Sequence, residues 1–158
     1  ESEGWLVTSD ETHSAQVYDN FPDPDNGFSV VVSLGSYVGG AVSQNIVSIP
    51  ATSGNLLTIG TSATDLWFVQ MQGSDAVTYD ATTIISTGAQ TAVVTYSSGV
   101  VSVYVGGALA GTVTLPTGLT ATLDTESNIT INGDFTLNLS GMRIYDFILT
   151  ADEITYLS

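Results

Sequence analysis

The chain has 158 residues, and its 16 Asp and Glu side chains face a single basic one, Arg143, for a formal net charge of −15. No basic patch can form, which excludes binding to nucleic-acid phosphates or to an anionic membrane surface. The absence of Cys excludes disulfides and thiolate metal sites, and no apolar run approaches the roughly 18 residues of a membrane span.

Composition favours strands over helices. Hydrophobic residues make up 43% of the chain and charged residues only 11%, well below the usual share of about a quarter. Thr, Ser, Val and Gly dominate, and these residues suit strands and turns. The chain starts at Glu1 without a basic, apolar leader, which fits a mature or excised piece and equally a chain that never carried a signal. We expect one all-β domain over 1–158, in an extracellular, cell-surface or virion setting.

The first half of the chain alternates short apolar runs with turn residues. Loop structure is expected over 8–20 (apart from AQVY), over the Pro-rich turn 20–27 and over the glycine-rich stretch 35–43. Strands are expected at Glu3–Val7, Phe28–Leu34, Asn45–Ile49, Asn55–Gly60, Leu66–Met71 and Thr78–Ile85.

The stretch Thr91–Leu115 predicts a three-stranded meander. Val101, Val103 and Val105 alternate with polar residues, the period expected of a strand with one buried face. Gly106-Gly107 between two β-rich runs indicates a hairpin turn. Because such a meander needs a second apolar layer, the pattern favours a two-sheet antiparallel sandwich or jelly roll.

The end of the chain combines strands with one helical turn. Strands are predicted at Asn128–Asn132, Phe135–Leu139 and Gly141–Phe147. Thr150 with Glu153 three residues later forms the pattern of a capping box, and Ile154 and Leu157 are spaced to lay that turn onto the sandwich. Trp5, Trp67, Tyr96, Tyr104 and Tyr145 fall in predicted strands, where we expect them to cover sheet faces.

Three stretches in order resemble a known family. They are VVTYSSGVVSVYVGGALAGTVTL in the meander, NITING, and GMRIYDFILTADEITYL at the end. Together they resemble laminin-G-like jelly rolls of the concanavalin A-like lectin and glucanase superfamily, over roughly Thr91–Leu157. The resemblance implies the fold. The family's aspartates before the closing Arg-Ile-Tyr are replaced here by Leu139-Ser140-Gly141, so the resemblance by itself does not imply a calcium site there.

Catalysis has little support in the sequence. Glucanases of the superfamily carry acids at alternate strand positions, and the nearest match, Asp124-Thr125-Glu126, falls in a predicted loop without a third acid. The single His13 lies in a polar segment and is interpreted as an exposed loop residue. Arg143 is expected to pair with an acid such as Asp146. We predict that the chain is not an enzyme, and a glycoside hydrolase is the remote alternative.

Two kinds of binding site are candidates. Asp23, Asp25 and Asn26 place oxygen ligands at alternate positions of a turn, a fragment of a calcium loop that is also simply a good turn sequence. No cofactor other than this calcium is suggested. For a glycan, the candidates are the aromatic rings of Tyr37 and Tyr79 with the polar groups of Gln70, Gln72 and Asp75.

The sequence leaves two functions nearly level. One is a lectin-like, glycan-binding module for adhesion or display. The other is a structural module that decorates a capsid or surface layer, attached to a larger assembly or forming a homo-oligomer. An exposed aromatic residue beside polar groups would favour the first, and an exposed apolar patch or unpaired edge strand the second.

Overall fold

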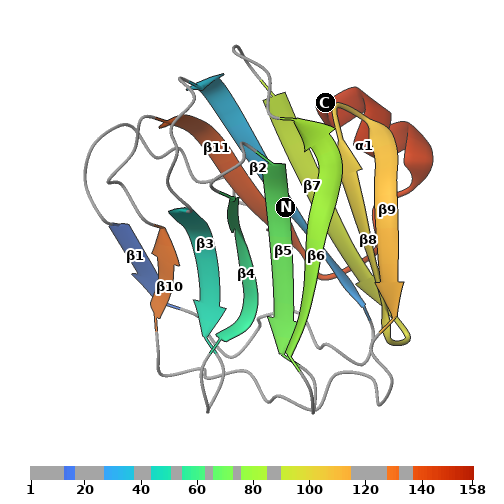
Figure 1. The fold of residues 1–158 in the computed structure, drawn as a ribbon, viewed down its shortest axis with the longest axis horizontal. Coiled ribbons are helices and arrows are strands. Elements are labelled where there is room, and N and C mark those ends of the chain that lie inside the picture. Colours follow the sequence, from blue (N-terminus) through green and yellow to red (C-terminus); the bar gives the residue numbers. More distant parts are fainter. Residues whose placement is uncertain are drawn as a thin grey trace.

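The computed structural model describes residues 13–16, 27–37, 44–50, 55–62, 66–72, 76–84, 90–114, 128–131 and 137–158. These residues form a sandwich of two antiparallel sheets with one short helix (Figure 1). The fold class predicted from the sequence is thereby confirmed. That the whole of 1–158 is a single domain stays a prediction.

The two sheets interleave strands from both halves of the chain. One sheet has the order β1-β10-β3-β4-β5-β6 and the other the order β11-β2-β7-β8-β9. The bounds are β1 His13–Gln16, β2 Phe28–Tyr37, β3 Gln44–Pro50, β4 Asn55–Thr61, β5 Leu66–Gln72, β6 Ala76–Ile84, β7 Gln90–Ser97, β8 Val100–Val105, β9 Ala108–Thr114, β10 Asn128–Ile131, β11 Leu137–Tyr145 and α1 Ala151–Leu157.

The main core lies between the two sheets. Alternate residues of β2, β7 and β8 point inward, among them Val30, Val94 and Val103, and they meet the buried side chains of β3, β4 and β5. Trp67 of β5 is the largest fully buried side chain among the described residues. Its indole Nε1 donates a hydrogen bond of 2.9 Å to Oε1 of Gln90 on β7, so one side chain bridges the two sheets.

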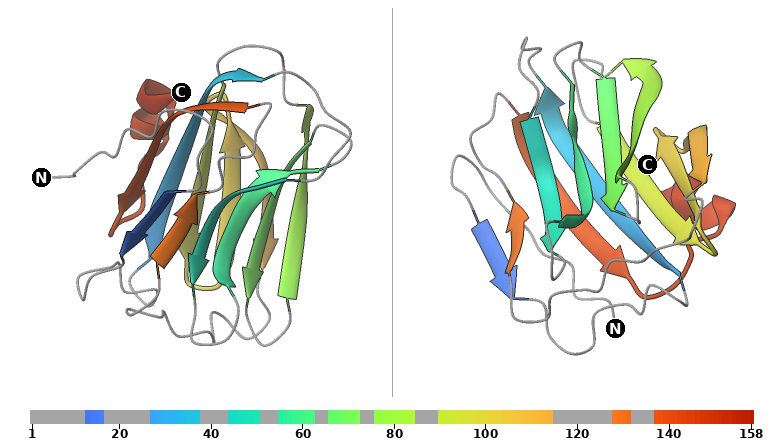
Figure 2. Two further views of the ribbon diagram at one scale, coloured as in Figure 1. Left: turned by 90° about the vertical axis from the view of Figure 1, so that its left-hand side faces the viewer. Right: turned by 60° about the horizontal axis from the view of Figure 1, so that its bottom comes forward.

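A second, smaller core lies on the other face of the five-stranded sheet. Val31 of β2 and Val93 of β7 pack there with Leu149 and with Ile154 of α1. Seen from the side in Figure 2, α1 lies on the side of this sheet that faces away from the six-stranded sheet. The central strands are therefore buried on both faces beneath the helix, which explains the unbroken apolar run Val30–Val32 in β2.

The segment between β11 and α1 is tied back to β2. The buried hydroxyl of Ser29 donates to the carbonyl oxygen of Phe147 and accepts from the backbone N–H of Leu149, both at 2.9 Å. Two hydrogen bonds to one fixed hydroxyl set the direction in which the chain enters α1. No helix in the described part of the chain is long and apolar enough to cross a membrane.

The predicted strands agree with the structure apart from three differences. The meander forms β7, β8 and β9 as expected, with positive φ angles at Gly106 and Gly107 in its second turn. Tyr37, expected in a glycine-rich loop, instead ends β2, because backbone pairing with Leu137 continues the strand through Gly35. His13, expected in a loop, lies in β1 and pairs with Ile131.

The third difference concerns the end of the sheet. The two strands expected at Phe135–Leu139 and Gly141–Phe147 form one strand, β11, over its described length. The register shifts between Asn138 and Leu139 and again between Leu139 and Gly141. A bulge absorbs an extra residue without ending a strand, so the polar Ser140-Gly141 pair marks an irregularity and not a turn. The predicted strand at Glu3–Val7, with Trp5, lies outside the described residues.

The helix begins as the capping pattern predicts. The Thr150 hydroxyl accepts from the Glu153 backbone N–H at 3.3 Å, and the Glu153 carboxylate accepts from the Thr150 backbone N–H at 2.8 Å. Ile154 is buried and Leu157 packs against the same cluster, as their spacing indicated. The pKa of Glu153 is lowered from its ordinary value of 4.5 by two hydrogen bonds from Thr150. The bond from the backbone has the larger effect, and the bond from the side chain the smaller one.

We expect this cap to make stability depend on pH. A carboxyl group whose pKa is lower in the folded than in the unfolded chain stabilises the fold above the unfolded pKa, and this contribution is lost as pH falls through the folded pKa. When the pH is lowered from about 7 to about 3, the melting temperature of the wild type should therefore fall further than that of Glu153→Gln. Thermal melts of both proteins test this, and parallel curves would contradict it.

Candidate functional site

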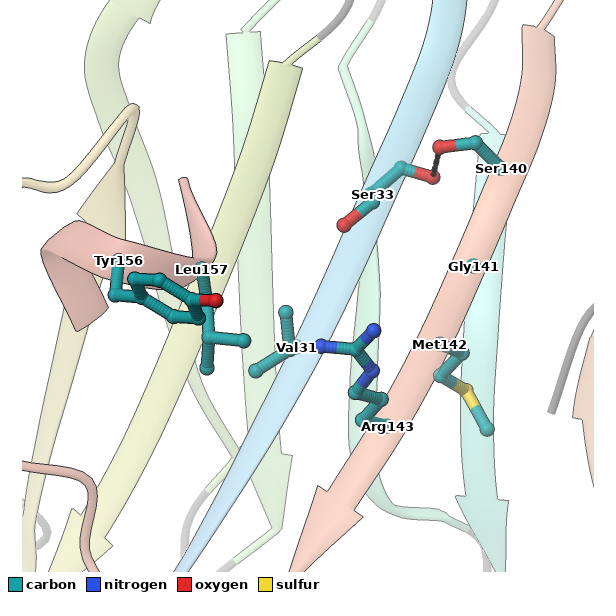
Figure 3. Close-up of a pocket in the computed structure, with 8 residues that line it drawn as sticks. All are labelled: Val31, Ser33, Ser140, Gly141, Met142, Arg143, Tyr156 and Leu157. Carbon is teal, nitrogen blue, oxygen red and sulfur yellow. Dashed lines mark hydrogen bonds between the residues drawn. The ribbon is translucent and has the colours of Figure 1, made fainter. Parts of the chain in front are cut away.

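A hollow lies on the outer face of the five-stranded sheet, beside the last turn of α1 (Figure 3). Its volume is about 540 Å³. We call it the Arg143 hollow, and it is lined by Val31, Ser33, Ser140, Gly141, Met142, Arg143, Tyr156 and Leu157. The floor comes from two neighbouring strands and one wall comes from the helix.

Strand register explains why these residues meet. Arg143 pairs with Val31 and Gly141 pairs with Ser33, so all four share the outer face of β11 and β2. Figure 3 shows the Arg143 guanidinium extending over β2 toward Val31, with Tyr156 and Leu157 entering from α1. Val31 and Leu157 belong to the second core, so the apolar part of the hollow rests on packed side chains.

The polar end of the hollow is organised by two serines. The Ser140 hydroxyl donates to the Ser33 carbonyl oxygen at 3.0 Å, which leaves its oxygen able to accept from a ligand. The Ser33 hydroxyl shares a hydrogen bond of 3.2 Å with the Thr91 hydroxyl. Next to Ser140, a Cβ added at Gly141 would meet nothing within 4 Å. Glycine therefore keeps the floor open at this point.

Arg143 makes no ion pair with an acid in the described part of the chain. Its side chain is exposed, and the expected pairing with Asp146 does not form, although both residues are described. Both sit at the same end of β11, but Arg143 lies over β2 while Asp146 follows the end of the strand. The one fixed positive charge of the molecule is thus held over the hollow without a neutralising partner among the described residues.

A second hollow adjoins the first on the other side of Tyr156. We call it the Tyr145 hollow; its volume is about 350 Å³ and it is lined by Tyr145, Phe147, Leu149, Asp152, Glu153, Tyr156 and Leu157. The Tyr145 and Phe147 rings pack with centroids 5.3 Å apart and planes inclined by 60°. Tyr156, which is 90% exposed, separates the two hollows, and Phe147 is 47% exposed. Aromatic surface therefore stands open to solvent beside a cation.

The residues proposed from sequence for a glycan site are not gathered at this place. Gln70 is exposed on β5, and Gln72 lies two positions later on the same strand. Tyr79 of β6 is paired with Val69, which is a buried core residue. Gln70 is the next residue along β5 and is paired with Thr78 instead. Tyr37 ends β2 in the other sheet. Asp75 lies outside the described residues, so a site built from these groups stays a prediction.

The predicted calcium ligands also remain untested. Asp23, Asp25 and Asn26 lie outside the described residues. Within the described ranges, no group of three or more His, Asp or Glu side chains is close enough to hold a metal ion.

Sequence reasoning missed the Arg143 hollow for a specific reason. The sequence favours an acidic neighbour as the partner of Arg143, and Tyr156 is not one of the two residues whose spacing marks the buried side of the helix. A partial signal was present, because an aromatic residue next to the inward-facing Leu157 must lie at the rim of the helix–sheet contact. Arg143 lies near this rim only because β11 pairs with β2, and the sequence alone does not show that pairing.

The fold and the sequence together establish the family. An antiparallel sandwich of this kind is one of the scaffolds on which binding and catalytic sites are grafted. The profile of the concanavalin A-like lectin/glucanases superfamily, in its laminin-G-like form, matches residues 9–155. The chain belongs to this family, as the three motifs in its second half indicated. No curated protein sequence matches it significantly.

Several solved structures share the fold. The CBM40 module of a Ruminococcus gnavus sialidase, bound to α2,3-sialyllactose, superposes with a TM-score of 0.70 at 12% identity, covering 98% of this chain and 96% of that one. The binding domain of botulinum neurotoxin DC, in complex with rat synaptotagmin II, gives 0.73 at 15% identity, covering 99% and 45%. Trypanosoma rangeli sialidase with the inhibitor DANA gives 0.66 at 18% identity, covering 98% and 27%.

These similarities describe the fold and not a shared activity. The chain spans about a quarter of the sialidase chain (27%) and less than half of the neurotoxin chain (45%). Identities between 12% and 18% leave the functional residues free to differ.

Proposed function

We propose that this chain is a non-catalytic, lectin-like module that binds glycan on the outer face of its five-stranded sheet. The observation that carries the proposal is the exposure of Tyr156. Its side chain is 90% exposed, and it lines the hollow on each side of it. Protein–sugar sites combine an exposed aromatic ring, which stacks on the apolar face of a pyranose, with polar groups for the hydroxyls. Ser140 and Arg143 supply those polar groups.

The absence of catalysis is also part of the proposal. Glycosidases need two carboxyl groups, one with a raised pKa so that it can protonate the leaving group. Asp152 and Glu153 line the Tyr145 hollow, but hydrogen bonds from Thr150 lower the pKa of Glu153 and engage its carboxylate in the helix cap. A carboxylate in that state is a poor acid. The family and the glycan-bound CBM40 neighbour are consistent with binding alone.

The first test is a glycan array with purified protein, with and without a calcium chelator. Because Tyr156 makes little contact with the fold, Tyr156→Ala should leave the melting temperature unchanged and weaken glycan binding about tenfold or more, the usual cost of losing a central aromatic anchor. Tyr156→Phe keeps the ring and should retain most of the binding.

The array also separates this site from the alternatives derived from sequence. Loss of binding in variants of Tyr37 and Tyr79, with Tyr156→Ala unaffected, would move the site to the groups first proposed, together with Gln70, Gln72 and Asp75. Loss with chelator would support calcium at Asp23, Asp25 and Asn26. If the protein bound no glycan on the array, the lectin function would be rejected.

A structural role is the second candidate, and one observation favours it. β9 is the last strand in the order of its sheet, and Leu109 on it is 56% exposed. An edge strand with an exposed apolar side chain can pair with another chain. In this alternative the module attaches to a capsid or surface layer or forms a homo-oligomer. Sedimentation velocity tests this alternative. The wild type should sediment as an assembly, and the added charge of Leu109→Lys should abolish that assembly.

A further inference from the structure

The charge pattern around the Arg143 hollow is unlike that of the rest of the molecule. The chain carries 16 acidic groups and one Arg, yet no acidic residue is among the described residues that line this hollow. Asp152 and Glu153 line the neighbouring Tyr145 hollow instead. Among the described residues that line the Arg143 hollow, the guanidinium is thus the only ionised group.

An exposed arginine in so acidic a chain would ordinarily gain by approaching a carboxylate. Here the side chain extends over β2 toward Val31, and no ion pair forms within the described residues (Figure 3). The planar guanidinium presents several N–H donors in a fork that matches a carboxylate in two parallel hydrogen bonds. The donors of Arg143 have no protein acceptor in the described structure, so they are available to a ligand.

The shape of the hollow suits a sugar that carries the carboxylate. Gly141 leaves the floor open beside Arg143, and the Ser140 oxygen can accept from a sugar hydroxyl. Half-buried Leu157 offers an apolar surface for the C–H face of the ring, and Val31 lies buried beneath it. A volume of about 540 Å³ is large enough for a monosaccharide with its neighbours.

We propose that the Arg143 hollow binds the carboxylate of an acidic sugar, with Arg143 as the specificity-determining residue; this rests on the glycan-binding function proposed above. The next sugar of the chain lies across Tyr156 in the Tyr145 hollow, where Tyr145 and Phe147 provide aromatic surface. The glycan is therefore bound with its acidic residue beside the middle of β11 and the last turn of α1, and with a neutral residue beside the end of β11 and the first turn of α1.

The net charge of −15 opposes any anion at long range. Salt shortens the Debye length from about 30 Å at 0.01 M to about 8 Å at 0.15 M, which screens distant acids far more than a contact pair. Binding of an acidic sugar should therefore be measured near 0.15 M salt, where the contact with Arg143 decides the result.

The test is isothermal titration calorimetry with matched probes. The acidic probes are α2,3-sialyllactose and trigalacturonic acid, and their carboxyl methyl esters are the neutral controls. Sulfated lactose distinguishes a carboxylate site from a general anion site. We expect the acids to bind at least about tenfold more tightly than their esters and than sulfated lactose, the advantage of a charge-assisted, bidentate contact.

Two variants assign the effect to the hollow. Arg143→Gln should remove the preference for acid over ester while neutral sugars still bind. Gly141→Val keeps Arg143 but fills the open floor, so it should weaken the acids about tenfold or more without lowering the melting temperature, since valine suits a strand and meets nothing there. Leu109→Ala on β9 is the matched surface control.

The outcomes separate this inference from the function on which it rests. Equal binding of acids and esters, an unchanged preference in Arg143→Gln, or tightest binding of sulfated lactose would overturn the carboxylate site while the lectin function stands. If neutral glycans bound on the array and none of the acidic probes bound, the carboxylate site would likewise be overturned while the lectin function stood. No binding to any glycan would overturn both.

Discussion

Trp67→Ala is expected to lower the free energy of unfolding by about 3–5 kcal/mol, the cost of removing a large aromatic side chain from a packed core. Trp67 is fully buried between the two sheets. The substitution leaves a cavity that the strands on either side cannot close, because their backbones are fixed by ladder hydrogen bonds. Since domains of this size are stable by only about 5–15 kcal/mol, the variant should lose a large share of the stability of the fold.

The conservative variant Trp67→Phe separates packing from hydrogen bonding. It keeps most of the ring volume but removes the Nε1 donor and leaves the Gln90 amide oxygen without its partner. We expect a loss of about 2 kcal/mol, mostly from that orphaned polar group. Urea denaturation followed by circular dichroism measures both variants without relying on the fluorescence of the residue replaced. Equal losses would show that the inter-sheet hydrogen bond, and not the cavity, dominates.

Gly27→Ala should cost about 3 kcal/mol although it adds a single methyl group. Gly27 has a φ of +82°, which L-residues rarely adopt. An added Cβ would lie 2.8 Å from the Tyr96 carbonyl oxygen and 3.1 Å from Ile148 Cδ1. The backbone oxygen belongs to the ladder between β2 and β7 and cannot move away, so backbone strain and steric overlap add together.

Gly106→Ala is the matched control for this prediction. Gly106 also has a positive φ, +55°, but its added Cβ would meet nothing within 4 Å. Only the conformational cost remains, about 1 kcal/mol. Chemical denaturation of both variants should therefore show a clear gap between them. Equal destabilisation would mean that the contact with Tyr96 contributes nothing.

The strands and the cap could be predicted from the sequence because their determinants are local. Alternating Val residues define β8, the Gly-Gly turn closes its hairpin, and Thr150 with Glu153 starts α1. Where prediction went wrong, a distant partner decided the outcome. Tyr37 stays in β2 because β11 runs beside it, and Ser140 is held in a bulge by the Ser33 carbonyl more than 100 positions away.

The candidate site shows the same limit more strongly. Arg143, Ser33 and Tyr156 come from three elements that meet only after the sheet has formed and the helix has docked on it. Proximity along the chain favours Asp146 as the partner of Arg143, whereas in the fold Arg143 extends over β2 toward Val31 (Figure 3). The resemblance to the family gave the scaffold correctly, but the family's degenerate motifs contain no information about which face carries a site.

One wall of the Arg143 hollow depends on a helix of only seven residues, Ala151–Leu157. A helix this short does not persist in water by itself, so it exists here because Ile154 is docked on Val31 and Val93 and because its first turn is capped. Undocking it would dismantle the hollow while leaving the sandwich intact. The apparent affinity for any ligand is then the intrinsic affinity multiplied by the fraction of molecules with the helix in place. Ligand and helix stabilise one another, and amide hydrogen exchange in the last eight residues becomes a reporter of occupancy.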